Sequence, residues 1–132
     1  MDLPPSGLSP GDLAGLLDEA NHHPWESVRS ALAGAGEPPH PRVAWLVAHL
    51  SETKREYWNL IAGAAGTLRP PPGPDLTLLM AWEVEAARAL PPAALTRRVT
   101  HAGVPFTVAE LLRLNARHTA WHAGQLAALA FP

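Results

Sequence analysis

Prolines divide this chain into segments and constrain its fold more than any other feature. The fifteen prolines gather in links between stretches where apolar residues recur every three or four positions. The clearest links are residues 37–41 and the longer glycine- and proline-rich stretch 63–74. Proline interrupts the interior of helices and sheets, while alanine is abundant and β-branched residues are sparse. The sequence therefore predicts separate helices joined by stiff connections.

The predicted helices begin after residues that can accept a hydrogen bond from a first-turn amide. Ser9 stands three positions before Asp12, and Thr107 stands three positions before Glu110, which is the spacing of a capping box. Asp75 precedes another apolar-periodic run. The expected helical segments are 10–21, a short one at 25–33, 43–62, 76–90 and 108–130.

Residues 95–106 do not continue the helical period. Val99–Thr100 and Val104–Phe106 flank a His-Ala-Gly sequence, so this stretch forms either a small β-hairpin or an extended link. Four main helices, one short helical segment and little strand signal predict an all-α protein, built as an up-and-down or crossover four-helix bundle. At 132 residues the chain is expected to be a single domain over 1–132, with 1–7 as a loose N-terminal arm.

The composition excludes several classes of function. The absence of cysteine excludes disulfides, thiolate metal ligands and a cysteine nucleophile. A formal net charge of −2 gives no basic surface for nucleic acid, and Arg97 and Arg98 are expected to be solvated. The sequence shows no signal peptide, and no run approaches the ~18 apolar residues of a membrane-spanning helix. These features predict a soluble, cytoplasmic protein with neither nucleic acid nor a membrane as partner.

Three histidines indicate a candidate metal site. His118 and His122 are four residues apart on the last predicted helix, so their imidazoles share one face, one turn apart. His49 falls in an apolar stripe between Leu46 and Leu50. Metal ligands in helical bundles come from inward side chains of neighbouring helices, and three nitrogens with an open fourth position are typical of catalytic zinc. The alternative is that all three are core or surface histidines with ordinary hydrogen-bond partners.

Longer stretches around these histidines resemble a known family. The sequence VAWLVAHLSETKREYW surrounds His49, and TVAELLRLNARHTAWHAGQLAAL contains His118 and His122. Together with PWESVRSALAG and ALPPAALTRRV, these segments resemble the DinB/YfiT-like superfamily of damage-inducible four-helix bundles, over residues 13–129. The sharpest element is the histidine pair followed by Ala-Gly-Gln.

The resemblance implies that the family's metal triad falls on His49, His118 and His122. Members of the family typically carry nickel or zinc and often form homodimers; manganese and iron also accept imidazole ligands. Several relatives transfer or isomerise substrates with a low-molecular-weight thiol such as bacillithiol, mycothiol or glutathione, and others are regarded as hydrolases. The resemblance therefore implies a metal-dependent thiol S-transferase, or a related hydrolase, that acts on a small molecule.

Histidines that bind metal usually donate their other N–H to a second acceptor. Asn115 and Gln125 lie three residues from a predicted ligand on the same helix, and Glu52 and Thr53 lie one turn beyond His49. These four residues are candidates for that role. Each is equally explained as an ordinary polar residue at a helix edge.

Other residues are weaker candidates for the site. His22 and His23 lie in a predicted connection that is able to cover it, whereas His101 lies in a glycine-containing link that is expected to be solvated. Four aromatic residues are expected to line either a substrate pocket or the core; these are Trp45, Tyr57, Trp58 and Trp121.

Two further functions compete with the enzyme. A non-catalytic metal-binding protein of the stress response would take up metal tightly and have no pocket for a substrate. A structural or partner-binding bundle would hold no metal, and it would fold normally after alanine replaces His118 and His122.

Overall fold

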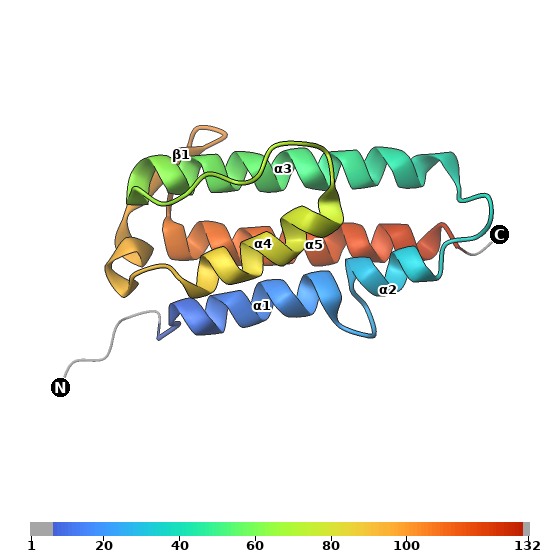
Figure 1. Cartoon of the computed structure of the whole chain (residues 1–132), viewed down its shortest axis with the longest axis horizontal. Helices are drawn as coiled ribbons and strands as arrows, with labels where there is room; N and C mark the ends of the chain where they lie inside the picture. The colour runs from blue at the N-terminus through green and yellow to red at the C-terminus, as the bar shows by residue number, and fades with distance from the viewer. Residues whose placement is uncertain (1–6, 131–132) are drawn as a thin grey trace.

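The computed structural model describes residues 7–130, and most of them are helical (Figure 1). The predicted loose arm, 1–7, lies outside the described residues except for Gly7. The elements in chain order are α1 (Pro10–His22), α2 (Val28–Ala33), α3 (Pro41–Ala65), α4 (Leu76–Arg88), the short 3-10 helix η1 (Pro92–Thr96), the strands β1 (Arg98–His101) and β2 (Val104–Thr107), and α5 (Val108–Ala128).

The helices begin at the predicted capping residues. The Ser9 hydroxyl accepts a hydrogen bond from the Asp12 amide at 3.1 Å, and the Asp12 carboxylate accepts one from the Ser9 amide at 2.9 Å. Thr107 and Glu110 form the same reciprocal pair at the start of α5, and Asp75 caps α4. Hydrogen bonds from the backbone amides lower the pKa of the Asp12 and Glu110 carboxyl groups. These caps satisfy first-turn amides that have no partner inside the helix.

Two helices differ from their predicted bounds. The second begins at Val28 rather than at residue 25, because Ser27 caps it and Glu26 has a left-handed backbone with a φ of 56°. The third begins at Pro41, where a first-turn proline is tolerated, and continues until Gly66, whose φ of 69° ends it. The ends of the other helices agree with the prediction to within two residues.

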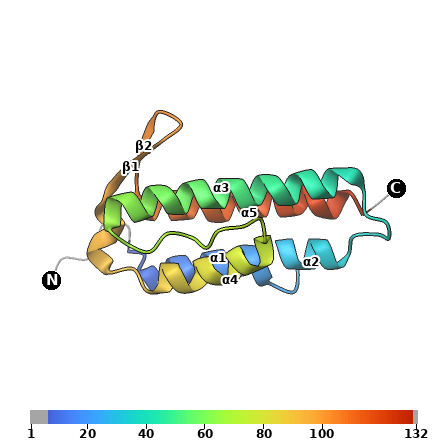
Figure 2. The ribbon, with the colours of Figure 1, turned by 45° about the horizontal axis from the view of Figure 1, so that its top comes forward.

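Residues 98–107 form a small antiparallel hairpin, one of the two alternatives that the sequence allows. His101 on β1 pairs with Val104 on β2. Ala102 and Gly103 make the turn, with φ values of 51° and 77°. Positive φ at both central positions is typical of the type I′ turn, which matches the twist of paired strands. Figure 2 shows the hairpin projecting from the end of the molecule where α3 ends and α5 begins.

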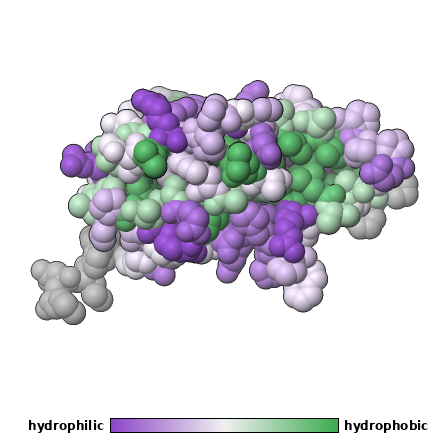
Figure 3. Space-filling view, in the orientation of Figure 1, coloured by the Kyte–Doolittle hydropathy of each residue, from purple (hydrophilic) through white to green (hydrophobic). Residues whose placement is uncertain are grey.

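The helices lie side by side along the long axis of the molecule (Figures 1 and 2). Helix α1 packs against α4 and α5, α3 packs against α5 and α4, and the short α2 packs against α5. Two clusters of buried apolar residues fill the interior; one includes Trp58 and Leu111, and the other includes Leu46 and Leu126. Figure 3 shows hydrophobic side chains at the surface between the first half of α3 and α2, beside the second cluster. The described chain is thus mostly helical, as predicted, with one small sheet in addition.

None of the helices within residues 7–130 combines the length and the apolar content that a membrane span requires.

Candidate metal centre

The three predicted histidines converge where α3 and α5 lie side by side. His49 comes from α3, and His118 and His122 come from successive turns of α5. The Nε2 atom of His118 lies 3.3 Å from Nε2 of His49 and 3.0 Å from Nε2 of His122. One ring nitrogen from each residue lies within 4.8 Å of the other two, and all three side chains are partly exposed. The triad is therefore one partly exposed cluster of imidazole nitrogens.

Hydrogen bonds among the three rings cannot pair all of the converging nitrogens with one another. An imidazole nitrogen carries either one hydrogen or one lone pair. Nε2 of His118 lies within hydrogen-bond distance of two other ring nitrogens, so it can make a normal bond to only one of them. A cation at the point of convergence would instead accept a lone pair from each of the three nitrogens.

Two of the three nitrogen separations in the triad are close to those around a tetrahedral divalent ion. Zinc binds imidazole nitrogen at about 2.0–2.1 Å, so two such nitrogens at a tetrahedral angle lie about 3.3–3.4 Å apart. The observed separations of 3.3 and 3.0 Å are close to this value. Three histidines also leave a fourth position open, as in catalytic zinc sites.

Gln125 holds His122 in the form that a metal ligand requires. Nδ1 of His122 lies 2.6 Å from Oε1 of Gln125. In the tautomer in which Nδ1 donates to this oxygen, Nε2 keeps its lone pair for an ion. This contact is the one that the predicted role of Gln125 requires, and that role stays a prediction.

A stack of side chains orients His49. The ring of Trp45 lies nearly parallel to that of His49, with centroids 5.1 Å apart and an interplanar angle of 8°. The Arg42 guanidinium lies 4.0 Å from the Trp45 ring centroid on the same helix. Thr53 donates its hydroxyl hydrogen to the backbone carbonyl of His49, not to the ring. The Trp45 stack therefore restricts the rotation of the imidazole.

Burial keeps the shared histidine neutral. Desolvation, reinforced by the neighbouring rings of His122 and His49, lowers the pKa of His118 to about 4. Desolvation also lowers the pKa of His49. Since neutral imidazole is the form that binds metal, His118 is ready to act as a ligand at neutral pH.

The lowered pKa predicts how the metal-free protein responds to acid. An unfolded histidine takes up a proton near pH ~6.5, whereas folded His118 stays neutral until the pH approaches its pKa of about 4. The unfolded state binds more protons in this range, so the free energy of unfolding should fall as the pH falls from ~6.5 to ~4. Urea unfolding of chelator-treated protein at several pH values measures this loss, which should be smaller in His118→Asn. An equal pH dependence in both proteins would contradict the assignment.

Two other predicted neighbours of the triad have different surroundings. Asn115 is fully buried on the core side of α5, and its side chain bonds to Lys54 and Glu83. This corrects its predicted role, because its hydrogen-bonding groups are used within the core. Glu52 is exposed, and among the described residues it forms no hydrogen bond or ion pair with a histidine; its charge acts on His49 only at a distance.

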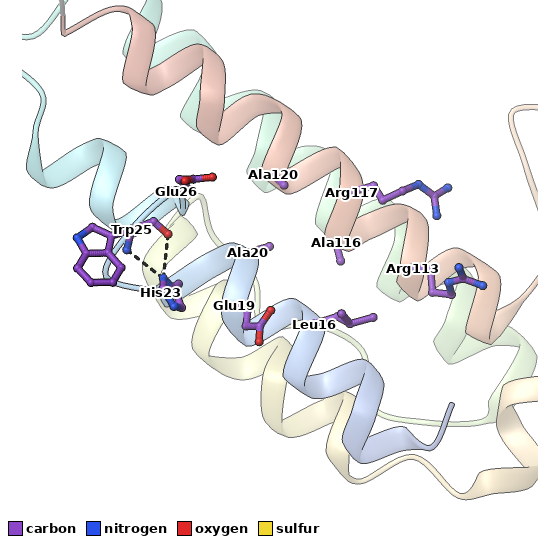
Figure 4. A pocket seen from close by; sticks show the side chains of 10 residues that line it. All are labelled: Leu16, Glu19, Ala20, His23, Trp25, Glu26, Arg113, Ala116, Arg117 and Ala120. Atoms are coloured by element: carbon purple, nitrogen blue, oxygen red, sulfur yellow. Dashed lines mark hydrogen bonds between the residues drawn. The ribbon is translucent and has the colours of Figure 1, made fainter. Parts of the chain in front are cut away.

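His22 and His23 do not cover the triad, contrary to one expectation from the sequence. His22 ends α1, and its Nδ1 lies 2.8 Å from Oδ1 of Asp18. His23 lines a groove of about 620 Å³ between α1 and α5. Figure 4 shows this groove, with His23 near one end and Arg113 near the other. The residues that line it include none of the triad histidines.

His101 lies closer to the triad than the sequence indicated. Its ring packs against Tyr57 with centroids 5.1 Å apart, and the Tyr57 ring lies 6.2 Å from that of His118. Oε1 of Glu56 lies 3.3 Å from Nδ1 of His101 but outside hydrogen-bond geometry, which leaves Nδ1 without a hydrogen-bond partner in the described part of the chain. The pairing of β1 with β2 places His101 here. The local sequence around His101 does not predict this position.

Comparison with known proteins supplies no relative. No protein-family model, no curated protein and no solved structure matches the chain. Function therefore has to follow from the geometry of the triad and its surroundings.

Proposed function

We propose that the chain is a metal-dependent enzyme of the DinB/YfiT-like superfamily, in which α1, α3, α4 and α5 form the four-helix bundle. The sequence segments that resemble the family support this proposal. The distribution of the triad also supports it, since His49 lies on α3 and the histidine pair lies on the last helix. A homodimer and a cytoplasmic location belong to the same proposal and stay predictions.

One observation carries the metal site. A single nitrogen of His118 lies within hydrogen-bond distance of two other ring nitrogens and can bond to only one of them. A divalent ion held by His49, His118 and His122 would satisfy all three. Nickel and zinc are the ions that we propose on the strength of the resemblance, and manganese and iron are further candidates because imidazole binds them too.

Such a site suits the transfer of a thiol to an electrophile, or a related hydrolysis. A bound divalent ion lowers the pKa of a water or thiol at its open position. The chain has no cysteine, so a sulfur nucleophile has to arrive as a cosubstrate such as bacillithiol, mycothiol or glutathione. Trp45 and Gln125 keep the ligand rings oriented. Tyr57 is buried beside His118, and burial raises the pKa of its hydroxyl, so the side chain stays neutral.

Assays with defined thiols test the enzyme and separate the two reactions. We expect metal-loaded protein to conjugate one of the three thiols to an activated aryl halide, or to hydrolyse an activated ester without thiol. The rate should fall by about 100-fold or more in His118→Ala, because the ion is lost. His22→Ala, which removes a histidine outside the triad, should keep the rate. Protein that binds metal yet turns over none of these substrates would contradict an enzymatic role.

A metal-binding protein of the stress response without catalysis is the second candidate. It is favoured by one observation, namely that the groove of about 620 Å³ between α1 and α5 lies away from the triad histidines. This candidate predicts tight metal uptake that depends on the triad, with no turnover in the assays above.

A further inference from the structure

A buried polar cluster lies in the core next to the triad. Lys54 on α3 and Glu83 on α4 form an ion pair with side chains that are 1% and 0% exposed. Oε1 of Glu83 accepts hydrogen bonds from Trp58 at 2.9 Å and from Asn115 at 2.8 Å. Oε2 accepts one from Asn21 at 2.7 Å. These contacts connect α1, α3, α4 and α5 through one carboxylate.

Stability alone does not account for this cluster. Moving two charges out of water is costly, and well-packed apolar residues in place of a buried ion pair are often as stable or more stable. The cluster also leaves Oδ1 of Asn21 buried without a hydrogen-bond partner in the described part of the chain. Hydrogen bonds and ion pairs form only in particular orientations, whereas apolar packing is not directional. They can therefore fix how far one helix is shifted along another.

The cluster fixes α3 relative to α5 at the level of the triad. Nζ of Lys54 donates to Oδ1 of Asn115 at 3.0 Å and to Oγ1 of Thr119 at 2.8 Å. Asn115 precedes His118 by one turn, and Thr119 follows it directly. Apart from the contact between His49 and His118, these two bonds are the side-chain hydrogen bonds between α3 and α5 within residues 7–130.

The geometry of the triad depends on the same relative position, because one ligand lies on α3 and two lie on α5. A shift of one residue moves a helix by about 1.5 Å along its axis, whereas metal–ligand distances tolerate only about 0.2 Å. We propose that the buried Lys54–Glu83 pair is a positioning device for the metal site, which acts through Asn115 and Thr119 to hold the ligands of α5 in register with His49. This inference rests on the proposed metal function.

Substitutions at Thr119 test this positioning role, because they change the size and shape of the side chain only slightly. Thr119→Val removes the hydroxyl that accepts from Lys54, and Thr119→Ser keeps it. Titration with cobalt(II), followed by its visible absorption, reports both the dissociation constant and the coordination geometry. We expect Thr119→Val to raise the dissociation constant by about 10-fold or more and to alter the spectrum, as changes behind metal ligands commonly do. Thr119→Ser should restore both towards the wild-type values.

Two more variants separate positioning from general destabilisation. Lys54→Met/Glu83→Gln removes both charges and keeps acceptors for Trp58 and Asn115, so it should fold and bind cobalt(II) more weakly. Leu90→Ala removes buried volume from the core at a residue beyond α4, on neither helix that carries the triad, and it should lower stability without changing the affinity of the folded protein. If the double variant does not fold, the Thr119 pair decides the question.

The outcomes distinguish this inference from the function on which it rests. Wild-type protein that fails to bind cobalt(II) or zinc overturns the metal site, and the positioning role with it. Wild-type protein that binds, with unchanged affinity and spectrum in Thr119→Val and in the folded double variant, overturns the positioning role alone. A loss in Leu90→Ala as large as that in Thr119→Val also overturns it.

Discussion

Replacing Lys54 with alanine should lower the free energy of unfolding by about 3–5 kcal/mol, the cost typical of removing one partner from a buried ion pair. The substitution leaves the Glu83 carboxylate with 0% exposure and without its cation. It also removes the donor to Asn115 and Thr119. Domains of this kind unfold with about 5–15 kcal/mol, so one side chain should account for a large share of the total.

Urea unfolding followed by far-UV circular dichroism measures this loss. The matched control is Arg88→Ala, which breaks an ion pair with Glu85 whose side chains are 53% and 72% exposed. The control should cost no more than about 1 kcal/mol, because solvent screens exposed pairs. Similar losses in the two variants would contradict the description of Lys54 and Glu83 as a desolvated pair.

Most helix boundaries were predictable because their signals are local. The capping residues Ser9, Asp75 and Thr107 lie within one turn of the amides that they bind. The start of α2 was missed, although Ser27 is a local capping signal for it; the left-handed backbone of Glu26 just before the cap has no such signal. The hairpin at 98–107 remained one of two alternatives, because short strands gain their stability from pairing and packing.

The candidate site was also predictable only in part. The spacing of His118 and His122 on one helix indicates a shared face, and the apolar stripe around His49 indicates an inward position. Sequence alone does not show that the two faces meet, and the resemblance supplied that link as an expectation. His101 was expected to be solvated, because only the strand register places it against Tyr57.

The buried ion pair was missed, although the sequence carries a signal for it. Lys54 follows Leu50 by four positions on the inward stripe of α3, and Glu83 lies among the apolar residues Met80 and Val84 on α4. A lysine and a glutamate on the inward stripes of two helices indicate a buried pair, since an unpaired charge in a core is prohibitively costly. This pattern can be read before a structure is known.

The triad should hold one divalent ion per chain, and binding should stabilise the fold. Ligand binding to the folded state alone adds about 2.7 kcal/mol at a free metal concentration 100-fold above the dissociation constant. Zinc or nickel should therefore raise the unfolding temperature of the wild-type protein. His49→Ala should show little or no such shift, because only two nitrogens of α5 remain at the site.

The most direct test of the metal site is the metal content of the protein after loading with nickel or zinc and dialysis, measured by inductively coupled plasma mass spectrometry. His22→Ala serves as the matched control, since His22 lies on α1 outside the triad. We predict about one ion per chain in the wild-type protein and in His22→Ala, and almost none in His49→Ala. Wild-type protein that retains no ion, or His49→Ala that retains as much as the wild type, would contradict a metal site built from α3 and α5.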